Sequence, residues 1–260
     1  MALLRCDFFS DVLELSTSMT VILPQRTSAQ IGMGGAARAT DAGHPVLYLL
    51  HGLSDDCTTW VRRTSIERYV AASGLAVVMP EVHRSFYADQ VHGNRFRTFL
   101  TDELPGIAGE FFRLSARRED TFVAGLSMGG YGALTWALAR PERFAMAASL
   151  SGALDLDRLR RNGSRSDVLA TSFGDRPLRG TPDDPAWLME QADPATLPQL
   201  YVCCGTDDPL LPDNEAFVQA CAARGVAVDV DFGPGGHDWA YWDARIQDVL
   251  GRLPSGDAAA

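Results

Sequence analysis

Short apolar runs alternate with longer amphipathic stretches over most of the chain. The runs expected to be strands are residues 46–50, 75–79, 121–124, 144–150, 200–204 and 226–232. Helical patterns lie between and after them, as over residues 131–139 and 241–253. Apolar runs that alternate with helices are typical of βαβ units, whose parallel strands are covered on both faces. The pattern therefore predicts the α/β class, with a mostly parallel central sheet and helices on both faces.

Other segments complete the predicted organisation. Residues 8–14 and 17–23 have the pattern of an antiparallel pair that opens the chain, and the small side chains of residues 32–43 predict a flexible connection. Residues 155–198 are rich in Arg, Asp and Pro and lie between two core strands, so we expect a lid or pocket wall there. The 260 residues fit one domain over 1–254, followed by a disordered tail over 255–260.

The most specific motif is Gly125-Leu-Ser127-Met-Gly129, which follows a strand-like run and precedes a helical one. This arrangement is the nucleophile-elbow pattern, in which a sharp turn presents the serine above a sheet. Glycines are needed on either side because a side chain there would strike the neighbouring strand or helix. A plain strand-to-helix turn is the alternative, and the other catalytic residues decide between the two.

A serine hydroxyl needs a histidine base and a carboxylate that fixes the tautomer of that base. In α/β-hydrolases the chain order is Ser, acid, His, and of the five histidines only His237 lies well after Ser127. The alternative for His237 is a loop residue that caps the final helix. The acid is expected after the strand at 200–204, where Asp207 and Asp208 compete. We favour Asp208, because Pro209 suits a turn aimed across the sheet, and Asp207 would then be a turn-former or a hydrogen-bonding neighbour.

An oxyanion hole needs two backbone N–H groups, one from the residue after the nucleophile and one from the loop after an early strand. Met128 and Leu53 are the expected donors, and Gly52 lets the backbone approach the substrate oxygen. His51 is expected to shape this loop by hydrogen bonding, since His237 already fills the place of the base. The further residues expected to contact substrate in a small pocket are Trp60, Tyr131 and Trp239, whereas Phe173 and Trp187 fit core packing better.

Together these motifs resemble the esterase D/tributyrin esterase branch of the α/β-hydrolases. That branch also contains S-formylglutathione hydrolases, some feruloyl and acetylxylan esterases, and the mycolyltransferase antigens. The resemblance covers nearly the whole chain, through Leu49-Leu-His-Gly-Leu53 with Trp60, Glu103-Leu-Pro105, Gly125-Leu-Ser-Met-Gly-Gly-Tyr-Gly-Ala133, Ser149-Leu-Ser-Gly152, Cys204-Gly-Thr-Asp-Asp208 and Gly236-His-Asp-Trp239.

The resemblance implies a cofactor-independent serine carboxylesterase that hydrolyses short-chain acyl esters through an acyl-enzyme, and it also places the acid at Asp208. Formylglutathione hydrolases carry Ser-Gly-Leu-Thr-Cys at the oxyanion loop and a His after the Gly-Gly of the elbow. This chain has His51-Gly-Leu-Ser54 and Tyr131 at those places, which favours the tributyrin esterase-like branch. Three alternatives stay open: a thioesterase such as S-formylglutathione hydrolase, an acetyl or feruloyl carbohydrate esterase, and a ligand-binding protein on a hydrolase fold.

Composition and charge restrict the classes of partner that the protein is expected to bind. A net charge of −10 and a pI near 4.9 argue against nucleic acid, and no apolar run approaches the ~18 residues of a membrane helix. Arg5 and Asp7 interrupt any signal-like apolar core, so we expect a cytoplasmic protein with reduced thiols, Cys57 among them. The paired acidic residues at 55–56, 155–157 and 183–184 lack calcium-loop spacing, and we expect solvated turns and no metal. The expected partner is a small-molecule ester, and a homo-oligomer is allowed.

Overall fold

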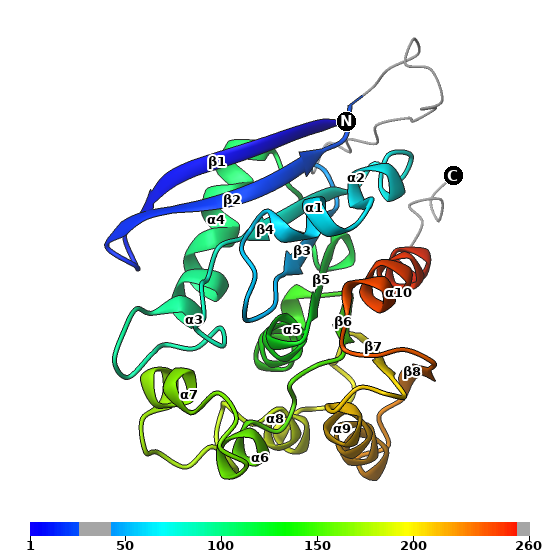
Figure 1. The fold of residues 1–260 in the computed structure, drawn as a ribbon. Helices are drawn as coiled ribbons and strands as arrows, with labels where there is room; N and C mark the ends of the chain where they lie inside the picture. The colour runs from blue at the N-terminus through cyan, green and yellow to red at the C-terminus, as the bar shows by residue number, and fades with distance from the viewer. Residues whose placement is uncertain (26–42, 254–260) are drawn as a thin grey trace.

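The computed structural model describes residues 1–25 and 43–253, which form an eight-stranded sheet in the order β1-β2-β4-β3-β5-β6-β7-β8 (Figure 1). The strands are β1 Ala2–Ser10, β2 Leu15–Leu23, β3 Val46–Leu50, β4 Ala76–Pro80, β5 Thr121–Leu126, β6 Met146–Leu150, β7 Gln199–Gly205 and β8 Val228–Gly233. From β4 to β8 in this order the neighbours are parallel, whereas β1 and β2 add an antiparallel edge. The predicted fold class is confirmed.

Helices connect the strands and cover both faces of the sheet. The α-helices are α1 Thr59–Arg63, α2 Ile66–Tyr69, α3 Phe96–Thr98, α4 Leu104–Phe112, α5 Met128–Ala139, α6 Leu156–Arg161, α7 Ser166–Phe173, α8 Pro185–Gln191, α9 Leu211–Ala223 and α10 Trp239–Arg252. Short helical turns of other types lie at η1 Phe99–Glu103, η2 Arg118–Asp120 and η3 Pro141–Arg143. In the described part of the chain, no helix is long and apolar enough to span a membrane.

The two faces of the sheet divide the core into two layers. Successive side chains of a strand point to opposite faces, so Tyr48 and Leu50 of β3 join one layer while Leu47 and Leu49 join the other. The first layer packs against α4, α5 and α7 to α9, and the second packs against α1, α2 and α10. Because both faces are covered, every residue of β3 is buried, which explains why its sequence is continuously apolar.

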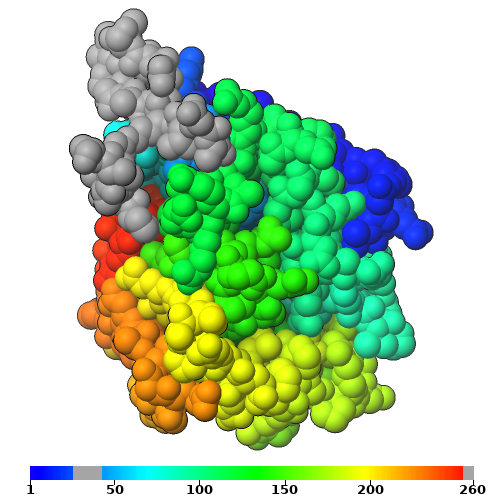
Figure 2. Space-filling model, turned by 180° about the vertical axis from the view of Figure 1, so that it is seen from behind, coloured from blue at the N-terminus to red at the C-terminus, as the bar shows by residue number. Residues whose placement is uncertain are grey.

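The opening hairpin differs from the sequence prediction. The first strand was expected over 8–14, but β1 ends at Ser10, and the turn that follows includes Glu14 with a φ of 56°. The edge strand has a solvent-exposed face, so its first residues lack a continuous apolar pattern and its start is hard to recognise. Figure 2 shows this hairpin, in blue, on the opposite side of the molecule from α9, in orange. Most of the connection expected at 32–43 and the tail expected at 255–260 lie outside the described residues.

Candidate active site

The elbow forms between β5 and α5. Ser127 takes φ 53° and ψ −114°, a strained conformation that turns the chain sharply from strand to helix, and its N–H donates to the Leu150 carbonyl over 2.9 Å. A Cβ on Gly125 would lie 2.3 Å from the carbonyl oxygen of Gly129, and one on Gly129 would lie 2.4 Å from that of Leu50. The two glycines are therefore required by close backbone contacts, as the motif predicts.

Three side chains from separate loops meet at this turn. The Nε2 atom of His237 lies 3.0 Å from Ser127 Oγ, and its Nδ1 atom lies 2.8 Å from Asp208 Oδ2. A carboxylate only accepts hydrogen bonds, so it holds the proton on Nδ1 and leaves the lone pair of Nε2 facing the serine hydroxyl. The ring also packs edge-on against Trp242, at 4.9 Å between centroids. The arrangement can accept the serine proton.

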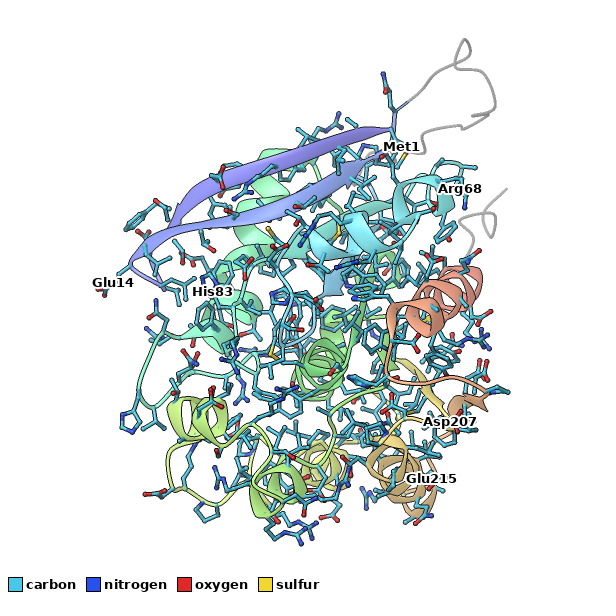
Figure 3. The ribbon with its side chains drawn as sticks, in the orientation of Figure 1. Met1, Glu14, Arg68, His83, Asp207 and Glu215 are labelled. Carbon is cyan, nitrogen blue, oxygen red and sulfur yellow. The ribbon has the colours of Figure 1, made fainter. Side chains whose placement is uncertain are left out.

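The two candidate acids have opposite environments. The side chain of Asp208 is buried, and its Oδ1 accepts a 2.8 Å hydrogen bond from the Leu210 N–H. Burial alone would raise the pKa of Asp208, but the hydrogen bonds from His237 and Leu210 lower it below the usual range. Asp207 instead points to solvent at the rim of the molecule, close to α9 (Figure 3). The structure therefore brings Asp208, and not Asp207, to the imidazole.

Backbone contacts hold the acid loop against the histidine loop. The N–H groups of Thr206 and Asp207 donate to the carbonyls of Gly233 and Gly235, each over 2.9 Å. A Cβ on Gly205 would lie 2.2 Å from the Gly235 oxygen, so the two loops touch through their main chains. This contact fixes the separation of Asp208 from His237 before any substrate is present.

A cavity of about 310 Å³ opens beside Ser127 and His237. Both expected oxyanion donors, Leu53 and Met128, lie in its wall. The other apolar lining residues are Phe86, Ala153, Leu159, Pro209 and Leu210, and the polar ones are Arg158, Asn162, Ser164 and Arg165. Residues 158–165 belong to α6 and the loop after it, so the segment between β6 and β7 does supply one wall of the cavity. Sequence reasoning missed these individual residues because they come from separate segments without a motif.

The four residues expected to contact substrate do not line this cavity. Trp60 is fully buried, where its Nε1–H donates to the Leu50 carbonyl over 3.1 Å and its ring packs edge-on against Trp239. Tyr131 is also fully buried, and its hydroxyl donates to the Asp183 carbonyl over 3.0 Å. Gly52 is also buried, and it has no side chain that could line the cavity. Trp60 and Tyr131 therefore belong to the core, whereas Trp239 is partly exposed and packs against Trp60.

The acidic pairs have structural contacts that correct part of the sequence prediction. Asp183 is not a solvated turn residue, because it is 1% exposed and forms ion pairs with Arg97 and Arg176. Asp155 and Asp184 cap the N-termini of α6 and α8. Among residues 1–25 and 43–253, no group of three or more His, Cys, Asp or Glu side chains is placed to hold a metal ion.

Comparisons with known proteins agree with this geometry. Residues 27–253 match the Esterase family model, described as "Putative esterase". The acetyl esterase of Caldicellulosiruptor saccharolyticus is 30% identical over 262 residues, covering 96% of this chain and 97% of the relative. Two Staphylococcus aureus structures, the fluorophosphonate-binding serine hydrolase FphF and the S-formylglutathione hydrolase FrmB, are each 33% identical, with TM-scores of 0.87 and 0.83. Each covers 97% of this chain and 98% of the other.

These likenesses extend over almost the full length of the chain. They confirm the resemblance to the esterase D/tributyrin esterase branch that the motifs indicated. The chain belongs to the Esterase family and is a serine carboxylic ester hydrolase with the α/β-hydrolase fold.

Proposed function

We propose that the protein hydrolyses small esters with short acyl chains, using Ser127 as nucleophile, His237 as base and Asp208 as the acid that orients it. The observation that carries the proposal is the continuous contact from Ser127 Oγ through the imidazole to the buried carboxylate, at 3.0 and 2.8 Å. Hydrogen-bond distances at both ends of the ring are the geometry that nucleophile activation requires.

The steps follow from the positions of these groups. Ser127 Oγ attacks the ester carbonyl carbon while its proton passes to His237 Nε2, and the oxyanion formed accepts hydrogen bonds from the N–H groups of Leu53 and Met128. Collapse of this intermediate breaks the bond to the alcohol, which leaves with the proton from Nε2. Water then attacks the acyl-enzyme by the same route, releasing the carboxylic acid and restoring Ser127.

The size and lining of the cavity support short acyl chains. Its volume of about 310 Å³ is at the lower end of the range for small-molecule sites. Apolar side chains, Phe86 and Leu210 among them, surround the space beside the nucleophile. Each methylene beyond the capacity of such a pocket is expected to cost about 1–3 kcal/mol of transition-state binding.

A nitrophenyl ester series tests both parts of the proposal. Acetyl and butyryl esters are expected to give higher kcat/KM than decanoyl and lauroyl esters, and Ser127→Ala is expected to lower turnover by about 10⁴ to 10⁶ with the fold unchanged. Near-normal turnover in purified Ser127→Ala would reject the nucleophile. A preference for lauroyl esters would leave the mechanism intact but reject the acyl length.

A second candidate, thioester hydrolysis, is favoured by the likeness to FrmB, which is an S-formylglutathione hydrolase. The same residues would act on a thioester, and only recognition of the leaving group would differ. Measuring kcat/KM for S-formylglutathione and for nitrophenyl acetate on the same preparation decides between them. If kcat/KM for S-formylglutathione is far above that for nitrophenyl acetate, thioesters are the substrate class. If it is far below, the oxygen ester is supported.

A further inference from the structure

The cavity wall supplied by α6 and the loop after it is basic, and this charge takes no part in the mechanism above. Arg158 and Arg165 both line the cavity, whereas no Asp or Glu of the described residues lines it. The whole chain has a net charge of −10, so the lining of the cavity is opposite in sign to the molecule. A cavity lined by one sign of charge attracts ligands of the other sign.

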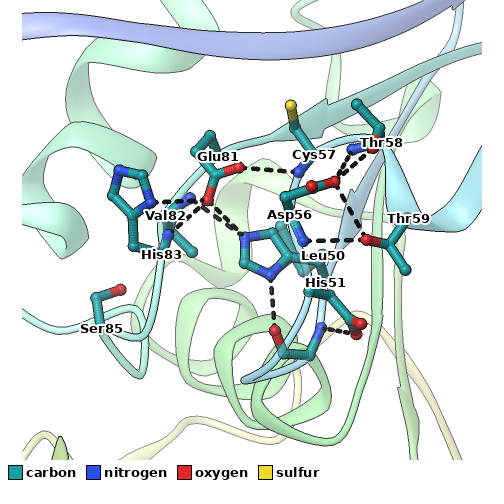
Figure 4. A network of polar contacts seen from close by, with 12 residues as sticks. Leu50, His51, Asp56, Cys57, Thr58, Thr59, Glu81, Val82, His83 and Ser85 are labelled. Carbon is teal, nitrogen blue, oxygen red and sulfur yellow. Dashed lines mark hydrogen bonds and ion pairs between the residues drawn. The ribbon is translucent and has the colours of Figure 1, made fainter.

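The carboxylates near the expected oxyanion loop belong to a separate network and are not part of the cavity wall (Figure 4). Glu81 accepts the N–H groups of Cys57 and His83, over 3.1 and 2.8 Å. Its Oε1 also lies 3.5 Å from Nε2 of the buried His51. Asp56 accepts the backbone N–H two residues further on, over 2.8 Å. These acidic groups are therefore occupied within the protein and do not face a bound substrate.

Of the two arginines in the wall, Arg158 already has a carboxylate partner. Its Nη2 donates to Asp213 Oδ2 over 2.9 Å, and its Nε lies 2.5 Å from Asp213 Oδ1. Asp213 is buried, so the negative charge lies directly against this guanidinium. The Nη2 of Arg158 also donates to the Pro209 carbonyl over 3.1 Å. Arg158 therefore joins the wall to the acid loop, and its charge is balanced by the protein itself.

Arg165 differs, because its side chain has no hydrogen bond, ion pair or ring contact with any other described residue. Asp167, two residues later, instead lies 3.4 Å from Arg84. Every other arginine between β6 and β7 contacts a carboxylate or a carbonyl, namely Arg158, Arg160, Arg161, Arg176 and Arg179. The guanidinium of Arg165 is thus the charge in this wall that is available to a ligand.

Two uncharged donors lie beside Arg165 in the same wall. Asn162 and Ser164 both line the cavity, and their side chains have no hydrogen-bond partner among the described residues. The backbone here is held in place, because the Ser164 N–H donates to the Leu159 carbonyl over 2.9 Å. The Leu169 N–H likewise donates to the Arg165 carbonyl over 2.9 Å. A guanidinium with an amide and a hydroxyl nearby supplies the donors that a carboxylate accepts from.

We propose that Arg165 makes the enzyme selective for esters that carry a carboxylate at a distance from the ester bond. The inference rests on the proposed function, because it names the substrate class of the same active site. Arg165 lines the same cavity as Ser127 and His237, so a substrate bound at the nucleophile can present a second group to it. This carboxylate takes no part in bond making, so its contact with Arg165 is expected to lower KM and to leave kcat nearly unchanged.

Two pairs of substrates separate the charge of this group from its size. In the first pair the anion is on the acyl side, in the nitrophenyl monoester of adipic acid, and its partner has a carboxamide in place of the carboxylate. In the second pair the anion is on the alcohol side, in 4-acetoxybenzoate, and its partner is 4-acetoxybenzamide. In at least one pair, kcat/KM is expected to be about 10- to 100-fold higher for the anion, and this ratio is expected to fall with added salt.

Two substitutions of Arg165 test the origin of that ratio. Arg165→Met removes the charge but keeps an unbranched side chain, and it is expected to bring the ratio within about threefold of one. Arg165→Lys keeps the charge and is expected to retain part of the preference. Arg161→Met is the matched control, because it removes an exposed charge of α6 outside the cavity wall while Asp157 keeps Arg179 as a partner. Its ratio is expected to equal that of wild type.

The measurement is kcat and KM for each substrate, with folding followed by circular dichroism. Ratios near one for both pairs in wild type, or an unchanged ratio in Arg165→Met, would overturn the proposal. An equal loss in Arg161→Met would assign the preference to the overall charge of the segment and would overturn it too. Nitrophenyl acetate is measured on the same preparations, and full activity of Ser127→Ala on that ester would instead reject the proposed function.

Discussion

At the scale of single residues, Asp207 and Asp208 show how position on a turn decides chemistry. Both are aspartates on one loop, yet the side chain of Asp208 is buried against His237 while Asp207 is exposed. The order of Ser, acid and His along the chain restricts the acid to this loop, so the three side chains that meet at the elbow could be named from the sequence. The aromatic pocket residues could not, because nearness in sequence does not tell which side of a loop faces the cavity.

The first prediction compares the two aspartates. Asp208→Asn keeps the shape but no longer requires the proton of His237 on Nδ1, so turnover of a short ester is expected to fall by about 10³ to 10⁴. Asp207→Asn changes an exposed side chain and is expected to retain turnover within about twofold. Steady-state kinetics on two folded variants measures this, and the reverse ranking would move the acid role to Asp207.

At the scale of elements, Glu103 explains why the opening hairpin turns where it does. Glu103 lies far after β1 and β2 in the sequence. Its Oε1 nevertheless accepts the N–H groups of Asp11 and Val12, at 2.7 and 3.2 Å, and its Oε2 accepts the Ser10 hydroxyl. Turn donors that would otherwise lack a partner are thus satisfied by a distant helical segment. A contact of this kind cannot be recognised from local pattern, which is why the predicted strand ended too late.

We therefore expect Glu103→Ala to lower the free energy of unfolding by about 1–3 kcal/mol, because it leaves these turn donors without their acceptor. Glu110→Ala, on the exposed side of α4, is the control and is expected to change it by less than about 0.5 kcal/mol. Urea titration of wild type, Glu103→Ala and Glu110→Ala gives their free energies of unfolding. Equal midpoints for Glu103→Ala and wild type would show that the turn is held by other contacts.

At the scale of the whole molecule, the sheet follows from the apolar runs, but the packing of the segment between β6 and β7 does not. Asp183 joins that segment to a distant part of the chain through Arg97, at 2.5 Å, and forms a second ion pair within the segment with Arg176, at 2.7 Å. Its carbonyl also accepts the hydroxyl of Tyr131 on α5, the helix that begins after the nucleophile. The contacts with Arg97 and Tyr131 depend on the tertiary packing, so the sequence pattern predicted only a solvated turn.

Removal of the Asp183 charge is expected to cost about 3 kcal/mol of unfolding free energy, because Asp183→Asn leaves two arginines facing a buried neutral side chain. Asp102→Asn breaks the exposed pair with Arg140 and is expected to cost less than about 1 kcal/mol. Thermal and urea unfolding of both variants and of wild type measure the two losses of unfolding free energy. A cost for Asp183→Asn no greater than that for Asp102→Asn would mean that the buried pairs contribute little.

The contact between the main chains around Gly205 and Gly235 has a consequence for the divergence of such enzymes. The loops that carry Asp208 and His237 follow the neighbouring strands β7 and β8, and their main chains are in direct contact. Residues 155–198 leave β6 and return to its neighbour β7, and Arg158 of this segment donates to the Pro209 carbonyl of the acid loop over 3.1 Å. Replacement of this excursion between homologues is thus expected to change substrate range and to retain the reaction chemistry only where the contact between Arg158 and the acid loop is kept.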